Sequence, residues 1–586
     1  MNLNDINTWF KLPVYYNGAK ASLNHTIVQD LELVETHDAS CTPLYSLCFR
    51  QDNDVAKALN PQLAEHYTTD VAFLKDSQQL LKTYTPSGVR YTDYSPNYKH
   101  ILDLWNELKG QSANHFKEKF YFVEQEWLEF LNRSEWFLQF MSVYNLLSPI
   151  ISLIVPILIL ILPFFILKLN GIHITIAKYI ETLKEVASQN AIGKLFVVDF
   201  TGISVQEKAT ICVSAALYLF SIYQNFMVCA RFNANMKLIH HYFNELRIYL
   251  QHTLTSMDDF LASSSSLVTF ASFNQVLTSR KEMLQKLYQK IVSITDYNMF
   301  NLGKIKEIGY VFKCFYELHV DTEYHASICY SLGFHGFLDC LKGVQHHLAE
   351  GKIQLADFSD TKTSLKGSYY LPLKDGRPVK NDVLLKKNYI VTGPNASGKT
   401  TVLKSTLVNL LLTQQFGCGF YDSATIQPFQ HFHCYLNIPD TSGRDSLFQA
   451  EARRCKDILD SINTHGEKER HFCVFDELYS GTNPEEAEQS AIAFMKYVAK
   501  KPNVVCMLTT HFSRVCKRLH KHERIQNHQM VSERQGDALL HTYTLAKGIS
   551  AIKGGAVVLK QLNYPREILD AQEEVERIQS VISGSN

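Results

Sequence analysis

Eight consecutive residues have the types and spacing that bind the phosphates of a nucleotide. They match the pattern G-x-x-x-x-G-K-[ST] and comprise Gly393, Pro394, Asn395, Ala396, Ser397, Gly398, Lys399 and Thr400. The glycines let backbone N–H groups turn toward the phosphates, and a helix N-terminus behind the loop favours an anion. The Lys399 ammonium can reach the β- and γ-phosphates, and the Thr400 hydroxyl can bind Mg²⁺. The loop, with Thr401 beside it, predicts ATP and Mg²⁺ as ligands.

Two apolar runs downstream of this loop end in polar residues. The run 472–475 ends in Asp476, which would hold Mg²⁺, and Glu477, which would orient or deprotonate a water. The run 504–508 leads to His511, which would contact the γ-phosphate or that water. Taken alone, Asp476 and Glu477 could be the solvated end of an ordinary strand, and His511 could have a purely structural role. Their order behind the phosphate loop favours an ATPase site with Lys399, Glu477 and His511 as catalytic residues.

These residues need strands and helices to position them. Residues 389–392 predict a buried strand, and apolar positions spaced by three and four after Lys399 predict a helix. From residue 369 to 586, short apolar strands alternate with helical stretches, which predicts an α/β P-loop domain of the ABC-like type. The polar segment 357–368 is its candidate boundary.

The region ahead of that boundary is predicted to be helical, so the fold class is α plus α/β. Residues 1–130 form a helical core region, and residues 231–356 a helical lever or core region. Heptads are not sustained in the second region, so an ordinary helix bundle explains its pattern equally well.

Two runs between these regions have the length of membrane spans. Residues 146–167 and 209–230 each form 22 consecutive positions without a charge. A helix of that length reaches across the roughly 30 Å hydrocarbon core of a bilayer. We expect a transmembrane hairpin within 131–230, the alternative being buried core helices. A hairpin leaves both flanks on one side, so the protein is predicted to be integral to a membrane with its ATPase domain facing the cytosol.

Composition limits the classes of partner. Lysine and arginine number 58 and aspartate and glutamate 58, so the net charge is +0, which argues against a strongly basic nucleic-acid binder. The 13 cysteines include no C-x-x-C pair, which favours a reducing compartment and no zinc site. The cluster His431-Phe432-His433-Cys434 lacks a second ligand pair at zinc spacing and is interpreted as an ordinary strand.

The order of these motifs closely resembles the ATPase of MutS-type DNA mismatch repair proteins. Gln415 opens a Gln-x-Gly element, 446–451 resembles the family's Ser-Thr-Phe-x-x-Glu signature, and 510–512 its Thr-His-aromatic switch. The resemblance implies a homodimer joined through the ATPase domains, in which Ser446 completes the partner's nucleotide site. It also places Gln415 with the nucleotide-binding residues. The alternative for Ser446 is a helix N-cap.

The resemblance is incomplete in the first half of the chain. Residues 23–33 resemble the start of the family's helical core, so the mismatch-reading and connector domains are expected to be missing. The apolar hairpin stands where the family has its DNA clamp. Two functions remain open: a MutS-like ATPase switch linked to mismatched DNA, and a membrane-anchored ATPase or scaffold without mismatch recognition. An ABC- or SMC-type ATPase is disfavoured because the chain has no Leu-Ser-Gly-Gly signature.

Overall fold

The computed structural model divides the chain into two compact units. The helical unit contains Gly88–Thr255 and Lys281–Ile328, and the sheet unit contains Asn2–Ser87, Ser256–Arg280 and Cys329–Asn586. The residues that the structure describes are 3–85, 98–110, 115–172, 174–189, 204–294, 297, 302–372, 378–436, 438, 446–535, 538–552, 559–560, 562 and 564–583.

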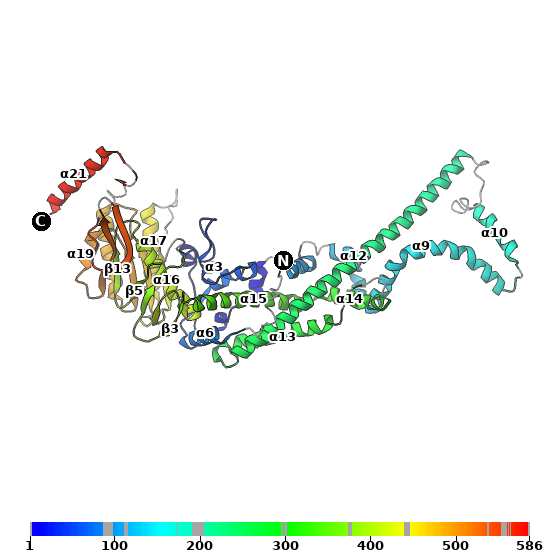
Figure 1. The fold of residues 1–586 in the computed structure, drawn as a ribbon, viewed down its shortest axis with the longest axis horizontal. Helices are drawn as coiled ribbons and strands as arrows, with labels where there is room; N and C mark the ends of the chain where they lie inside the picture. Colours follow the sequence, from blue (N-terminus) through cyan, green and yellow to red (C-terminus); the bar gives the residue numbers. More distant parts are fainter. Residues whose placement is uncertain are drawn as a thin grey trace. The chain divides into compact units, whose positions relative to one another are not determined.

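A six-stranded sheet forms the centre of the sheet unit (Figure 1). Its strand order is β13-β12-β6-β11-β10-β9, with all neighbours parallel except the antiparallel pair β12–β13. The three predicted strands are confirmed as β6, β10 and β11, which are almost wholly buried, as expected for a sheet covered on both faces. The strands are β6 Asn388–Thr392, β9 His431–Tyr435, β10 His471–Asp476, β11 Val504–Thr509, β12 Ile525–Gln535 and β13 Ala538–Lys547.

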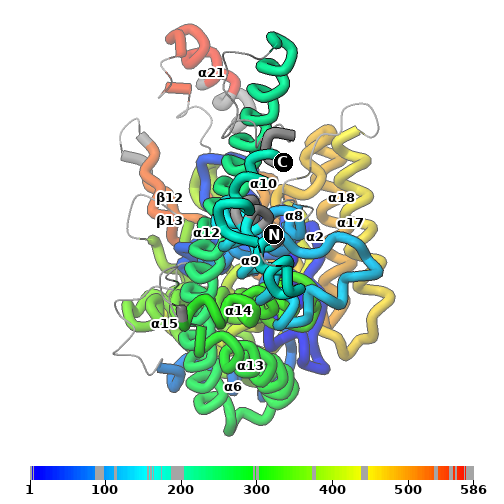
Figure 2. Tube along the Cα trace, turned by 90° about the vertical axis from the view of Figure 1, so that its right-hand side faces the viewer, coloured from blue at the N-terminus to red at the C-terminus, as the bar shows by residue number. Residues whose placement is uncertain are grey.

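Helices cover both faces of this sheet. One face packs on α17 (Leu447–Thr464), α18 (Pro484–Lys500) and α19 (Ser513–Leu519), and α17 and α18 lie side by side (Figure 2). Cys473 and Phe475 of β10 point into that core and the intervening residue does not, as the two-residue period of a strand requires. α16 (Lys399–Phe416) contacts β10 and β11 but has no residue in that core, so it covers the opposite face.

A second sheet extends the α/β domain further toward the N-terminus than expected. Its order is β5-β4-β8-β3-β7, and the predicted boundary 357–368 runs from β3 into β4. In sequence this segment resembles a linker because polar residues are interspersed with the buried ones along two short strands. The strands are β3 Gln354–Phe358, β4 Ser364–Ser368, β5 Asn381–Leu384, β7 Cys418–Gly419 and β8 Ser423–Ile426.

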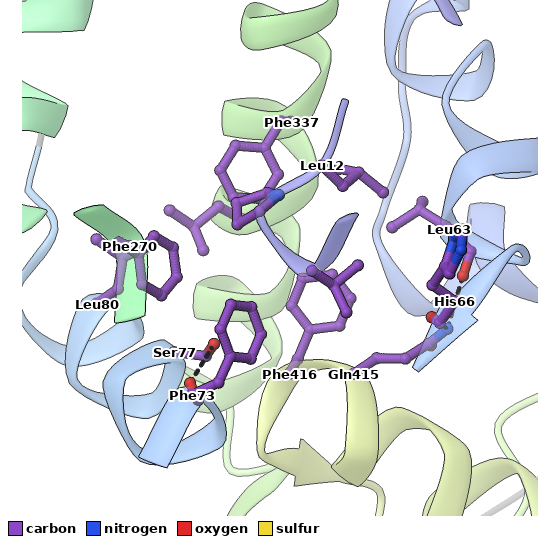
Figure 3. A pocket seen from close by; sticks show the side chains of 13 residues that line it. Leu12, Leu63, His66, Phe73, Ser77, Leu80, Phe270, Phe337, Gln415 and Phe416 are labelled. Carbon is purple, nitrogen blue, oxygen red and sulfur yellow. Dashed lines mark hydrogen bonds between the residues drawn. The ribbon is translucent and has the colours of Figure 1, made fainter. Parts of the chain in front are cut away.

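The N-terminal segment belongs to the sheet unit, so the predicted region 1–130 is not one body. It carries short helices and a two-stranded sheet, β1 (Lys20–Ser22) with β2 (His66–Thr68). Phe73 of α6 (Val71–Thr83) and Phe416 of α16 line the same apolar cavity, which Figure 3 shows from close by. The segment is therefore held to the end of α16 by apolar contacts.

Two long helices dominate the helical unit. α9 spans Glu135–Leu169, and α12 spans Val205–Ser264, of which residues up to 255 belong to this unit. The predicted boundary at residue 230 therefore falls inside one continuous helix. The other longer helices with residues in this unit are α7 Tyr98–Lys109, α10 Ile176–Gln189, α13 Ala271–Ile291, α14 Leu302–Val320 and α15 Thr322–Ala349.

α14 packs closely on the first turns of α9. A Cβ added at Gly309 would lie 2.4 Å from the carbonyl oxygen of Glu135, so only glycine permits this approach. The Gln139 side chain accepts a hydrogen bond from the Gly309 N–H (2.8 Å) and donates one to the Ile305 carbonyl (2.7 Å). The first turns of α9 are thus held against α14.

The apolar parts of α9 and α12 lie antiparallel and touch through polar side chains. Ser148 donates to the carbonyl of Asn225 and Tyr218 donates to that of Ser152, each at 3.4 Å. Among the described residues, two helical stretches are long and apolar enough to cross a membrane, Glu135–Ile154 and Val205–Ser264. In their most apolar windows only 22% and 6% of the residues are buried, whereas a core helix would be mostly buried.

Candidate nucleotide site

The phosphate loop joins β6 to α16 in a conformation that depends on small residues. Gly398 caps α16 with φ +90°, and Ala396 has φ +61°, both in the left-handed region that glycine enters most easily. A Cβ at Gly393 would lie 2.6 Å from Oγ of Ser397. The strand, loop and helix therefore follow one another as the sequence predicts.

Lys399 is buried beneath this loop, with 5% of its side chain exposed. Its ammonium donates to the carbonyl oxygens of Gly393 (3.0 Å) and Pro394 (3.2 Å) and lies 3.8 Å from Oε1 of Glu477. Burial lowers the pKa of Lys399, and the charges of Glu477 and Asp476 oppose that shift. A buried cation held by neutral carbonyls and one nearby carboxylate is well placed to bind an anion.

Asp476 stands at the carboxyl end of β10 between two hydroxyl groups. Thr400 in the first turn of α16 donates to its Oδ2 at 2.9 Å, and Thr509 at the end of β11 donates to its Oδ1. The carboxylate and the Thr400 hydroxyl are oxygen ligands of the kind that Mg²⁺ prefers. The structure thus brings together both residues predicted to bind the metal.

Glu477 follows directly, in a strained backbone conformation with φ +52°. Its Oε1 lies 3.6 Å from Nδ1 of His511, whose side chain is half exposed. The neighbouring His511 and the Lys399 charge lower the pKa of Glu477 against the opposing effect of partial burial. Glu477 is therefore ionised at neutral pH, the form that orients or deprotonates a water.

Ser446 stands at the N-terminus of α17, where it is the N-cap. Its hydroxyl accepts from the Gln449 N–H at 3.3 Å, and the Gln449 side chain accepts from the Ser446 N–H at 3.0 Å. The buried Glu451 of the same helix accepts from the Ser480 hydroxyl (2.9 Å) and from the Gly481 N–H (3.1 Å). The signature helix is thereby tied to the loop that follows Glu477.

One predicted site residue is not brought to the phosphate loop. Gln415 lies in the last turn of α16, about 24 Å from Lys399 at 1.5 Å per residue. Its amide donates to the carbonyls of Leu63 (2.6 Å) and His66 (3.0 Å) and accepts from the Tyr45 hydroxyl. We correct its assignment from nucleotide binding to holding the N-terminal segment.

Tyr543 on β13 borders the loop and was not predicted. A Cβ at Gly398 would lie 3.2 Å from its ring, which is 46% exposed, and its own φ is +57°. Its backbone is held by Asn381, whose side chain donates to the Tyr543 carbonyl at 3.0 Å. A spacing pattern around the loop could not reveal it, because Tyr543 is more than 140 residues away in sequence and reaches the loop only through strand pairing.

The residues at this site fit a nucleoside triphosphate with a divalent cation. The Ser397 hydroxyl is buried without a hydrogen-bond partner in the described residues, which leaves a donor inside the loop. Asn395 and Ala396 are exposed at its rim, and Thr401 is partly buried in the first turn of α16. Backbone N–H groups, a lysine and two oxygen ligands are the groups that bind Mg²⁺ and phosphates in P-loop proteins.

Known proteins are similar in sequence to part of this chain. Residues 389–579 match the family model of MutS domain V. The DNA mismatch repair protein MutS of Parabacteroides distasonis is 27% identical over 43% of this chain and 30% of its own length. Endonuclease MutS2 of Lactococcus lactis is 25% identical over 58% of this chain and 46% of its own.

A human relative shows the same pattern of partial coverage. MutS protein homolog 4 of Homo sapiens is 25% identical over 47% of this chain and 30% of its own length. The chain thus spans less than half the length of each of these three curated relatives. Residues 389–579 of the chain thus form a domain of the MutS family.

Proposed function

We propose that the chain binds ATP with Mg²⁺ and hydrolyses its γ-phosphate to ADP and phosphate. The observation that carries this proposal is the convergence of four side chains at the carboxyl ends of β6 and β10. Thr400 contacts Asp476 at 2.9 Å, and Lys399 lies 3.8 Å from Glu477. Ligands of open α/β sheets bind at these strand ends.

Each residue has a defined part in this reaction. Lys399 exchanges its two carbonyl partners for phosphate oxygens and offsets the negative charge that builds up during phosphoryl transfer. Thr400 and Asp476 would hold Mg²⁺, which neutralises phosphate charge when it is bound. Glu477 orients the attacking water and accepts its proton, and His511 positions Glu477 from 3.6 Å.

The ATPase acts as a nucleotide-dependent switch in a dimer of two copies of the chain. Support comes from Ser446, which is exposed at the N-terminus of α17 and available to a second copy. Its helix is coupled to the nucleotide site through Glu451 and the loop 480–481, so a contact at Ser446 is transmitted to the residues after Glu477. ATP would favour the closed dimer and hydrolysis would release it.

A membrane-anchored form of this ATPase is favoured by the exposed faces of α9 and α12. The two helices form a hairpin, with the ATPase domain in the cytosol where ATP is available. Large apolar side chains face outward along both helices: Ile150, Leu153, Ile154, Leu158, Ile161, Leu162, Phe165 and Ile166 on α9, and Val213, Leu217, Leu219, Phe220, Tyr223 and Phe226 on α12.

A link to mismatched DNA is proposed on family membership alone. Two of the three relatives carry DNA mismatch repair or endonuclease in their names, whereas the balanced charge of this chain gives DNA no strong electrostatic attraction. DNA binding by the detergent-solubilised protein that weakens with added salt would support the DNA role. Absence of binding at low salt would leave the membrane-anchored ATPase.

ATP binding is tested with Lys399→Ala in the full-length chain. The variant loses a buried cation that the phosphates require, so nucleotide binding measured by equilibrium dialysis is expected to disappear. Lys387→Ala removes an exposed lysine just ahead of β6 and is the matched control. Unchanged binding by Lys399→Ala, or equal losses in both variants, would contradict the proposal.

A further inference from the structure

Four histidines meet at the amino ends of two neighbouring strands. His431 and His471 are the first residues of β9 and β10 and are paired directly in register. His433 lies two residues further along β9, on the same face, and His465 caps the C-terminus of α17. One nitrogen from each of His431, His465 and His471 lies within 4.8 Å of the other two. Residues 40 positions apart in sequence are thus gathered into a single cluster.

The hydrogen bonds of the cluster leave ring nitrogens facing one another. Nδ1 of His465 donates to the carbonyl oxygen of Ser461 at 2.7 Å, so Nε2 is the nitrogen that remains for a cation. Nδ1 of His471 lies 3.0 Å from Nε2 of His433. The His471 side chain is fully buried, yet its Nε2 has no hydrogen-bond partner in the described residues. A buried nitrogen without a hydrogen-bond partner destabilises the fold, and a bound cation would supply the missing partner.

A carboxylate supplies the opposite charge. Oε2 of Glu469 lies 2.6 Å from Nε2 of His431. Carboxylates paired with imidazoles orient the histidines that bind metals and raise their basicity. Three imidazoles and one nearby carboxylate are the ligand chemistry of a zinc-type cation rather than of Mg²⁺, which prefers oxygen.

We propose that His431, His465 and His471 bind one divalent transition-metal cation of the zinc class, with Glu469 balancing its charge. This site is separate from the nucleotide site. It lies at the amino end of β10, and Asp476 lies at the carboxyl end, about 17 Å away along the strand. The cation also lies at the C-terminus of α17, where the helix dipole favours positive charge.

The site gives α17 a fixed point at each end. Glu451 near its N-terminus bonds the loop after Glu477, and His465 at its C-terminus binds the metal. The metal holds the end of the helix that is remote from Ser446. Its role is structural, because the three histidines surround the cation within the sheet unit and none of them borders the phosphate loop.

Zinc binding is measured on the full-length chain in detergent, after removal of metal with a chelator. Competition titration with a chromophoric zinc chelator and elemental analysis of the dialysed protein are expected to give one zinc per chain. The double variant His431→Ala/His465→Ala is expected to bind zinc at least about 100-fold more weakly. His37→Ala removes an exposed histidine outside the cluster and is expected to bind as the unaltered chain does.

Two readouts keep the test independent of folding and of ATP hydrolysis. Cobalt(II) substituted for zinc should give the strong visible absorption of a four-coordinate site, and His465→Ala alone, at a partly exposed helix end, should lose it. Retained ATP binding by the variants shows that the domain is folded. Substoichiometric zinc in the unaltered chain, or equal zinc affinity in the double variant, would overturn the proposal.

Discussion

The Thr400 hydroxyl donates a 2.9 Å hydrogen bond to Oδ2 of Asp476, which joins the first turn of α16 to the end of β10. Without this contact the phosphate loop and the acidic strand end are only two motifs 76 residues apart. With it, a hydroxyl and a carboxylate share one edge of the sheet, where a cation bound to nucleotide phosphates can be held by both. The ATPase proposal depends on this relationship more than on either motif.

Asp476→Asn is expected to raise the Mg²⁺ concentration needed for half-maximal ATP hydrolysis by at least about 10-fold. The amide keeps the shape of the carboxylate and can accept from Thr400, but it has no charge to attract the cation. Phosphate release measured across a Mg²⁺ titration tests this. Asp457→Asn changes an exposed aspartate of α17 and should leave the curve in place. The same Mg²⁺ dependence in both variants would remove Asp476 from the metal site.

Tyr543→Ala is expected to weaken nucleotide binding. Its half-exposed ring borders Gly398, where a nucleotide base can stack on it, and such stacking contributes about 1–3 kcal/mol. Binding of a fluorescent ATP analogue should therefore weaken by about 5- to 150-fold. Tyr543→Phe keeps the ring and should bind normally. Normal binding by the alanine variant would show that the ring does not contact the nucleotide.

Gly481→Ala is expected to lower the melting temperature of the sheet unit. A Cβ there would lie 2.6 Å from Cγ of Leu447 and 2.9 Å from the backbone nitrogen of Phe448, so α17 must shift. Overpacking of this kind costs about 1–3 kcal/mol. Gly466→Ala is the matched control, since its added Cβ meets nothing within 4 Å. Equal melting temperatures for the two variants would mean that the loop and α17 are not closely packed.

The hairpin is expected to keep the protein in the membrane pellet after alkaline carbonate extraction. Leu158→Arg combined with Leu217→Arg places a charge on the exposed face of each helix, at about 2.5–3.5 kcal/mol per residue in a bilayer centre. The double variant should be partly released. Leu562→Arg, at an exposed leucine outside the hairpin, should stay in the pellet. Release of the unaltered chain would show that neither helix spans the membrane.

Much of the nucleotide site could be predicted from sequence because its strands are continuous apolar runs. In a sheet covered on both faces, such runs end abruptly at polar residues, and those ends carry Asp476, Glu477 and His511. Lys399 and Thr400 follow from the loop pattern itself. Each of these signals lies within a short stretch of the chain and can therefore be recognised in a single sequence.

The remaining features depend on contacts between distant segments. Gln415 matched a family element, yet its amide bonds Leu63 and His66, a contact that no spacing within α16 reveals. His431 and His471 look unrelated in sequence, but parallel pairing of β9 and β10 places them side by side. The absence of zinc ligand spacing argued against a metal site, because that spacing describes ligands on adjacent turns rather than on paired strands.

The most direct test of the central claim is a single-turnover measurement with radiolabelled ATP on the unaltered chain and Glu477→Gln. Glutamine keeps the size of the side chain but cannot accept a proton from water, and loss of a general base lowers rates by about 100- to 10,000-fold. We predict that the unaltered chain releases labelled phosphate, and that Glu477→Gln binds ATP in the presence of Mg²⁺ and retains it unhydrolysed. Phosphate release by Glu477→Gln at the rate of the unaltered chain would contradict the account.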